Sequence, residues 1–444
     1  MGKMQSRAAR GTRDILPTQM AGRRAVIDKI VAVFERYGYE PLETPAIERL
    51  EVLSGKYGEE GDKLMFKLQG RGEGAKESDL ALRYDLTVPL ARVMASHPDI
   101  KLPFKRYQIQ PVWRAERPQK GRFREFYQCD VDVVGAASVS ADAEIVAIVN
   151  ECLSVLGFRQ YTIRINHRKV LHGIAEYSGT PTGKATDLCI AIDKLERIGF
   201  EGVRKELESR GIERGPCAKI MDLLEAKDST GDKMEVLERT VGGTRAGAAG
   251  LEDLREFLEY LEPLGVPASA ISVDPCMARG LDYYTGLIYE SVVEEPRIGS
   301  LTGGGRYDDL IGLFAGRDMP ATGTTIGLER ILAAMEDLGM LPEAKTRVQV
   351  LVAFQDRSLE KEAFAVCREI RSAGIRCEVY LKSKGALRDQ IAYANGKGVP
   401  WVVILGPDEL AKGTVVLKDM ARRDQRDVAR GEVAGVLAAS LEGA

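Results

Sequence analysis

The sequence predicts an α/β protein made of three regions, each with its own pattern of apolar residues. Residues 1–168 and 265–340 contain consecutive strand-like runs with few helical windows between them, which favours a mixed, mostly antiparallel sheet. Residues 169–264 are rich in Lys, Glu, Leu and Ala at helical spacing and predict a helical insertion. Residues 346–444 alternate strands with helices, which predicts a smaller C-terminal α/β domain with a mostly parallel sheet.

The composition is that of an ordinary folded protein. The 444 residues are 44% hydrophobic and 29% charged, and a chain of this length forms roughly two to four domains. The 63 basic and 66 acidic side chains leave a net charge of −3, which excludes a uniformly basic nucleic-acid-binding protein but allows local basic patches. No run approaches the ~18 apolar residues of a membrane helix, and Met1–Ile15 has no apolar signal core. We therefore expect no membrane contact and a cytoplasmic location.

The cysteines and histidines offer no metal site. The seven cysteines are an odd number without paired spacing, which is typical of reduced thiols. The three histidines form no His-Glu-x-x-His motif, and no Cys-x-x-Cys is present, so neither zinc pattern has its ligands. Any metal ion is expected to arrive with a substrate.

In the first region, residues 18–37 form the first predicted element. Val26, Ile30, Val33 and Phe34 share one helical face, and Gly38 ends the pattern. The strand-like runs that follow are 64–68, 80–84, 106–114, 126–134 and 161–166, with 270–292 and 300–305 after the insertion.

In the C-terminal region, the elements begin after a predicted helix at 327–338 and a short linker. Strands are expected at 348–354, 377–380, 401–405 and 414–417, and helices at 359–373 and 386–395 and at the end of the chain. Strands that alternate with helices usually pair in parallel, because each helix carries the chain back across the sheet.

The stretch Lys105–Arg124 is the most basic in the chain, with seven basic residues against the single acid Glu116. Arg114 stands in an otherwise regular strand, where an arginine needs an anion. Arginine binds phosphate through two charge-assisted hydrogen bonds, so this stretch is suited to a polyphosphate. A basic surface hairpin is the alternative interpretation.

The strand at 126–134 alternates strictly, so Phe126, Gln128, Asp130 and Asp132 share one face. Such a polar face predicts a ligand site, whereas a solvent-facing edge strand is the alternative. Two carboxylates and an amide suit a ligand that carries an ammonium group and other donors.

Three glycine-containing stretches complete the candidate site. Residues 277–286 combine Arg279 with paired tyrosines, and residues 302–309 allow a ligand to approach the backbone closely. Residues 321–330 run from a strand into a helix that begins with Glu329 and Arg330, where an arginine opposes the helix dipole and indicates an anion nearby. Tight turns and an ordinary helix start are the alternatives.

In order, these segments resemble the motifs of class II aminoacyl-tRNA synthetases, and within that class the histidyl-tRNA synthetase family. The resemblance covers almost the whole chain. It rests on an N-terminal signature at Gly11–Pro17, motif 1 at Tyr39–Pro45, an amino-acid-binding strand at Leu82–Pro89, motif 2 at Trp113–Phe126, a histidine signature at Arg279–Thr285 and motif 3 at Gly327–Arg330.

The resemblance implies a role for each matching residue. Arg279 and Arg114 would be catalytic. Histidine would be bound by Asp85, Leu86, Thr87, Arg114, Gln128, Asp132, Arg279, Tyr283 and Tyr284. ATP would be bound by Arg114, Glu116, Arg122, Phe126 and Arg330, and the tRNA acceptor end would meet Gln119 and Arg124. No metal ligands are implied, since Mg²⁺ would be held mainly by the ATP phosphates.

The resemblance also implies the activity. Such an enzyme converts L-histidine and ATP to histidyl-adenylate and pyrophosphate, then transfers histidine to the 3′ end of histidine tRNA. The architecture would be a class II catalytic domain, a helical insertion near the acceptor arm, and a C-terminal anticodon-binding domain, in a homodimer.

Two alternatives remain within this class. One is an inactive relative, such as a regulatory subunit of ATP phosphoribosyltransferase or a sensor of uncharged tRNA. Arg114, Arg330 and the Arg279–Thr285 signature disfavour it. The other is a synthetase for a different amino acid, which the paired tyrosines with Asp132 disfavour.

Overall fold

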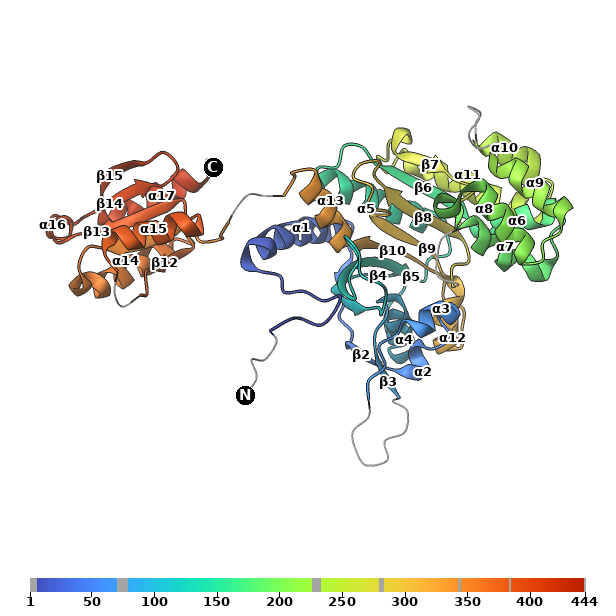
Figure 1. Ribbon diagram of the computed structural model, residues 1–444, viewed down its shortest axis with the longest axis horizontal. Coiled ribbons are helices and arrows are strands. Elements are labelled where there is room, and N and C mark those ends of the chain that lie inside the picture. Colours follow the sequence, from blue (N-terminus) through green and yellow to red (C-terminus); the bar gives the residue numbers. More distant parts are fainter. Residues whose placement is uncertain are drawn as a thin grey trace. The chain divides into compact units, whose positions relative to one another are not determined.

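The computed structural model describes residues 6–69, 79–225, 233–278, 283–341, 345–382 and 385–442. The chain divides into two compact units, one built mainly from Val26–Met340 and the other mainly from Leu341–Ala444 (Figure 1). No helix in these ranges is both long enough and apolar enough to cross a bilayer.

A large sheet forms the centre of the first unit. Its strand order is β1-β4-β5-β10-β9-β8-β6-β7. Neighbours from β4 to β6 are antiparallel, whereas β1 and β7 at the two edges pair in parallel. The strands are β1 Glu40–Pro41, β4 Phe104–Trp113, β5 Glu125–Val134, β6 Thr162–His167, β7 Ile271–Val273, β8 Leu287–Val292, β9 Thr302–Arg306 and β10 Ala321–Gly327. The predicted mostly antiparallel sheet is therefore confirmed.

Helices cover this sheet. Helix α5 (Ser140–Leu156) packs on β5, β8, β9 and β10, and α13 (Leu328–Asp337) packs on β5 and β10. Helix α5 lies outside every predicted element, although its polar residues Ser140, Glu144, Glu151 and Ser154 recur at helical spacing on one face. The other helices are α1 Pro17–Arg36, α2 Leu50–Leu53, α3 Gly58–Lys63, α4 Thr87–Ser96 and α12 Asp308–Ala315.

Two predictions near the N-terminus have different outcomes. The helix predicted at 18–37 is α1, and its Val26, Ile30, Val33 and Phe34 are buried. The strand predicted at 64–68 is wrong, because only Lys67 forms an isolated bridge, opposite Ala81. Strand β3 (Leu80–Leu82), which contains Ala81, pairs with β2 (Ile47–Arg49) in a two-stranded sheet.

A block of helices separates β6 from β7. These two strands are parallel neighbours, so the block leaves and rejoins the sheet at one edge. Its first and last helices pack together, and a Cβ on Gly173 would lie 2.6 Å from Gly247 Cα, so a larger residue has no room there. The helices are α6 Arg168–Ser178, α7 Ala185–Ile192, α8 Leu195–Ser209, α9 Arg214–Glu225, α10 Lys233–Val241 and α11 Arg245–Leu261.

The second unit contains a five-stranded sheet of order β12-β11-β13-β14-β15. Its first three strands are parallel, as the alternating pattern predicts, whereas β14 and β15 form an antiparallel pair. Strand β15 is mostly exposed and polar, so its sequence has no apolar pattern that predicts a strand. The elements are β11 Val350–Phe354, α14 Glu360–Ser372, β12 Cys377–Val379, α15 Leu387–Lys397, β13 Trp401–Leu405, α16 Pro407–Ala411, β14 Thr414–Asp419, β15 Asp424–Ala429 and α17 Val433–Glu442.

Candidate functional site

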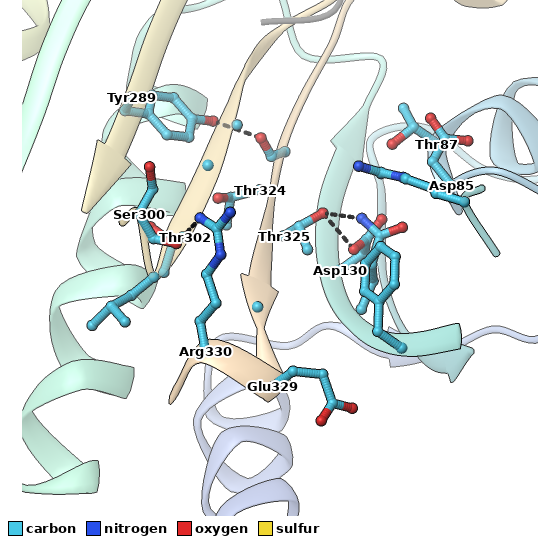
Figure 2. A pocket seen from close by; sticks show the side chains of 18 of the residues that line it. Asp85, Thr87, Asp130, Tyr289, Ser300, Thr302, Thr324, Thr325, Glu329 and Arg330 are labelled. Carbon is cyan, nitrogen blue, oxygen red and sulfur yellow. Dashed lines mark hydrogen bonds between the residues drawn. The ribbon is translucent and has the colours of Figure 1, made fainter. Parts of the chain in front are cut away.

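A cavity of about 330 Å³ opens on the large sheet of the first unit (Figure 2). Strands β5, β9 and β10 supply much of its wall. The loop between β4 and β5, the starts of α4 and α13, strand β8 and the residues just before it also contribute. The predicted site residues that line it are Asp85, Thr87, Arg114, Glu116, Arg122, Phe126, Gln128, Asp132, Tyr283, Tyr284 and Arg330. These residues come from five of the stretches singled out in the sequence, 82–89, 105–124, 126–134, 277–286 and 321–330, and they meet in one cavity.

Three buried carboxylates, Asp85, Asp130 and Asp132, form what we call the acidic group. Each is at most 2% exposed. The fully buried Arg106 places Nη2 2.9 Å from Asp132 Oδ2, and the Tyr307 hydroxyl donates to Asp132 Oδ1. Burial raises the pKa of Asp132, and burial together with the Asp132 charge raises the pKa of Asp130 to about 8, against the attraction of Arg106. The group is therefore short of positive charge.

Asp85 stands just before α4 and is held by three donors. The Tyr57 hydroxyl donates to Oδ1 at 2.9 Å, the Val88 N–H donates to the same atom at 3.1 Å, and the Tyr283 hydroxyl lies 3.5 Å from Oδ2. Burial raises the pKa of Asp85. The ring of Tyr283 packs edge-on against Tyr284, with centroids 5.0 Å apart.

Three arginines, Arg114, Arg122 and Arg330, form what we call the basic group. The Arg114 guanidinium lies 4.4 Å from the ring of Tyr84 and 5.2 Å from that of Phe126. Its Nε donates to the Tyr84 carbonyl at 3.0 Å. Cation–π contacts of this kind hold a guanidinium in place and leave its terminal nitrogens able to meet an anion.

The other two arginines contact groups that a ligand could replace. Arg122 Nε lies 3.0 Å from Glu116 Oε2, and the Arg122 side chain is 44% exposed. Arg330 Nη1 donates to the Ser300 carbonyl at 2.7 Å (Figure 2).

The N-terminal segment fastens the β4–β5 loop. The Arg124 N–H donates to the Gly11 carbonyl at 2.8 Å, and the Arg13 guanidinium lies 3.8 Å from the ring of Phe123. Arg13 also pairs with Glu329, at the start of α13. We call residues 11–13 the strap, because they connect the β4–β5 loop to α13, the helix that carries Arg330.

Some predicted residues lie elsewhere. Leu86 is fully buried at the start of α4, and its carbonyl accepts from Arg106 Nη2 at 3.3 Å. Gln119 is exposed in a turn of the β4–β5 loop, and Arg124 Nε donates to the Glu116 carbonyl at 3.1 Å. Arg279 lies outside the described residues.

The structure adds residues that the sequence analysis did not assign to the site. Arg106 and Tyr307 hold Asp132, whereas Thr325 on β10 donates to Asp130. The alternation of β5 already placed Asp130 on the ligand face. Tyr307 and Thr325 lie in stretches that the sequence analysis included in the candidate site, but their pairing with aspartates was not predicted, because the partners lie 175 and 195 residues apart in the chain.

Among the described residues, no group of three or more His, Cys, Asp or Glu side chains could hold a metal ion. Two glutamates that line the cavity, Glu116 and Glu329, pair with Arg122 and Arg13.

The chain matches two family models in succession. The model described as histidyl-tRNA synthetase matches residues 11–331. The model described as anticodon binding domain matches residues 348–440.

Individual relatives match over nearly their full length. A histidine–tRNA ligase of Gloeobacter violaceus is 41% identical, over 97% of this chain and 98% of that protein. One of Aeropyrum pernix is 42% identical, over 96% of each. The crystal structure of a histidyl-tRNA synthetase from a Nostoc species superposes with a TM-score of 0.85 at 34% identity, covering 99% of this chain and 100% of that one.

Proposed function

The chain belongs to the histidyl-tRNA synthetase family and ligates histidine to tRNA using ATP, and we propose that its cavity binds histidine at the acidic group and ATP at the basic group. The observation that carries this assignment is the separation of charge within one cavity. Buried carboxylates suit an ammonium group, whereas partly exposed arginines suit phosphates.

At the acidic group, Asp85, Thr87 and Gln128 would bind the α-ammonium group of histidine. Asp132 and Tyr284 would face the imidazole, supported by Tyr283. Neutral imidazole has one donor and one acceptor nitrogen, which a carboxylate and a hydroxyl can recognise together. A pocket built of such partners rejects analogues that lack them.

At the basic group, Arg114 would bridge the histidine carboxylate and the α-phosphate. Phe126 would stack on adenine, Glu116 would bind the adenine edge, and Arg122 and Arg330 would hold the outer phosphates. Arg279, in the histidine signature, would also meet the α-phosphate.

The first step would be an in-line attack of the histidine carboxylate on the α-phosphorus of ATP. The new oxygen–phosphorus bond gives histidyl-adenylate, and the bond to the β-phosphate oxygen breaks to release pyrophosphate. A carboxylate needs no deprotonation, so positioning and charge carry the step. In the second step, the terminal ribose hydroxyl of tRNA would attack the adenylate carbonyl and release AMP.

Mg²⁺ would accompany ATP and neutralise part of its phosphate charge. Magnesium commonly binds through substrate phosphates and keeps several waters, so the ATP phosphates would be its main ligands.

The remaining regions would bind tRNA. Gln119 and Arg124 would meet the acceptor end, the insertion at 169–264 would approach the acceptor arm, and the domain at 346–444 would read the anticodon. Residues 1–168 and 265–340 would form the catalytic domain of a cytoplasmic homodimer, with motif 1 at the dimer contact.

The test is ATP–pyrophosphate exchange with Mg²⁺ and each of the twenty amino acids in turn. We expect exchange with histidine alone, a loss of at least ~100-fold in Arg114→Gln, and little change in the exposed control Arg117→Gln. Exchange with another amino acid would reassign the substrate. No exchange with any of them, from folded protein, would favour an inactive regulatory or tRNA-sensing relative.

A further inference from the structure

We propose that Thr325 and Asp130 act as positioning residues that turn the carbonyl oxygen of Gln128 towards the α-ammonium group of the substrate. This inference rests on the proposed function, because it assumes that the acidic group binds the amino end of histidine. It adds two residues that neither touch the reacting atoms nor belong to the motifs by which the family resemblance was established.

The three side chains meet because of strand register. Thr325 on β10 lies directly opposite Asp130 on β5, and Gln128 lies two residues along β5 on the same face. Gln128 Nε2 donates to Thr325 Oγ1 at 2.9 Å, and Thr325 Oγ1 donates to Asp130 Oδ1 at 2.6 Å (Figure 2). The chain of donors therefore runs from Gln128 through Thr325 to Asp130.

The direction of this chain fixes the Gln128 amide. A threonine hydroxyl has one proton, and here Asp130 Oδ1 accepts it, as a carboxyl oxygen can whether or not the other oxygen is protonated. The hydroxyl can then only accept, so Gln128 must present its NH₂ group to it. The carbonyl oxygen of Gln128 is left buried on the cavity wall without a hydrogen-bond partner among the described residues.

An unpartnered buried oxygen is unfavourable in the empty protein and indicates a ligand donor. An ammonium group fits because it donates and carries the positive charge that the acidic group lacks. Asp130 faces Asp132 on its own strand, Thr325 on β10, and Arg106 on β4, with Asp85 also adding negative charge. Asp130 thus orders Thr325, and because a bound ammonium group favours the ionised form of a neighbouring carboxyl, Asp130 gives up its proton and adds negative charge to the site when the substrate is present.

The experiment compares three ligands that differ at the amino acid backbone. L-histidine has both the ammonium and carboxylate groups, histidinol keeps only the ammonium group, and 3-(imidazol-4-yl)propionate keeps only the carboxylate group. Histidine is measured by its KM in ATP–pyrophosphate exchange, and the two analogues by their inhibition constants in the same assay. The KM for ATP is measured alongside.

The variants separate the hydrogen bonds that run from Gln128 through Thr325 to Asp130 from the charge of Asp130. Thr325→Val removes the hydroxyl at nearly constant shape, Thr325→Ser restores it, and Asp130→Asn keeps an acceptor for Thr325 but removes the charge. We expect Thr325→Val to weaken histidine and histidinol by about 10-fold and to leave the propionate and ATP within about 2-fold. Thr325→Ser should recover most of the loss. Asp130→Asn should weaken the two ammonium ligands and bind the propionate equally or more tightly.

Equal weakening of all three ligands, no weakening, or failure of Thr325→Ser to recover the loss would each overturn the inference. Should Thr325→Val not fold, Thr325→Ala takes its place in the same comparison. Failure of the proposed function would look different, because the unaltered protein would then show no histidine-dependent exchange.

Discussion

The acidic and basic groups line the same cavity but are built in opposite ways. Asp85 and Asp132 are at most 2% exposed and accept hydrogen bonds from neighbours such as Tyr57 and Tyr307. Arg122, in contrast, is 44% exposed and pairs with a glutamate on its own loop. One group is fixed by the core of the sheet, and the other is free to exchange its partner.

This difference has an energetic meaning. Exposed ion pairs contribute about 0–1 kcal/mol, so Arg122 can leave Glu116 for a phosphate at little cost. Breaking a buried pair costs about 3–5 kcal/mol, so the acidic group keeps its geometry whether or not a ligand is bound. On the proposed assignment, preorganisation is therefore concentrated at the acidic group, where histidine would bind, and adaptability at the basic group, where ATP would bind.

The largest expected effect comes from removing the cation of the acidic group. Arg106→Met should destabilise the first unit by about 3–5 kcal/mol, because it leaves buried carboxylates without their counter-charge. Urea unfolding in a Trp401→Phe background would follow the first unit through Trp113, the remaining tryptophan. The matched control is Arg255→Met, which breaks an exposed pair with Glu238 and should cost at most ~1 kcal/mol. Equal costs would show that protons already neutralise the carboxylates.

At the basic group, the corresponding change should affect ligand binding rather than stability. Arg122→Ala should raise the KM for ATP by about 10-fold or more, since a charge-assisted hydrogen bond is worth roughly 1.5–3 kcal/mol. The KM for histidine and the urea midpoint should remain unchanged. Initial-rate exchange kinetics would measure both constants, with Arg117→Ala in the same loop as control. A rise in both KM values would contradict the independence of the two groups.

A change in the strap should have a smaller effect on the KM for ATP. Gly11 has φ of 84°, and a Cβ there would lie 2.7 Å from Arg124 Cγ and 2.9 Å from Pro118 Cγ. Gly11→Ala should loosen the loop and raise the KM for ATP roughly 5-fold, because the left-handed conformation alone costs an L-residue about 1–2 kcal/mol. The control is Gly38→Ala. Gly38 has φ of 77°, and a Cβ there would have no atom within 4 Å, so this variant has the same backbone strain without a contact to the β4–β5 loop. An equal rise in KM in both variants would exclude the strap as the cause.

The smallest expected effect is on pH dependence at the acidic group. Burial raises the pKa of Asp130 to about 8, so between roughly pH 4 and 8 the folded protein holds a proton that the unfolded chain has released. Stability attributable to Asp130 should therefore fall as the pH rises through this range. Asp130→Asn should remove that loss, so its stability relative to the unaltered protein should rise from pH 4 to pH 8. Urea midpoints at several pH values test this, and a difference that does not vary with pH would contradict it.

Much of the site could be predicted because its residues lie in short local patterns. A strand has a period of two, so the alternation of residues 126–134 alone places Gln128, Asp130 and Asp132 on one face. The same rule does not say which neighbouring strand supplies their partners. Arg106 belongs to the basic stretch 105–124 in the sequence, yet register places it opposite Asp132 and not with the other arginines.

The fold shows the same division. Strands β4, β5, β6 and β10 follow from their own apolar and polar patterns, and α1 follows from one apolar face. Strand β15 does not, since it is polar and almost wholly exposed. Pairing with β14 decides what its local sequence leaves open.

By itself, the sequence determined the class of protein, the motifs that line the cavity and the types of chemical group they bring. Those properties depend on residue identity and on spacing within one helix or strand. Only the tertiary structure decided that Arg106 and Tyr307 hold Asp132, that Gly11 and Arg13 hold the β4–β5 loop, and that Gln128 donates to Thr325. These contacts join residues far apart in the chain, and their pairing is fixed by strand register and burial, which no short stretch of sequence contains.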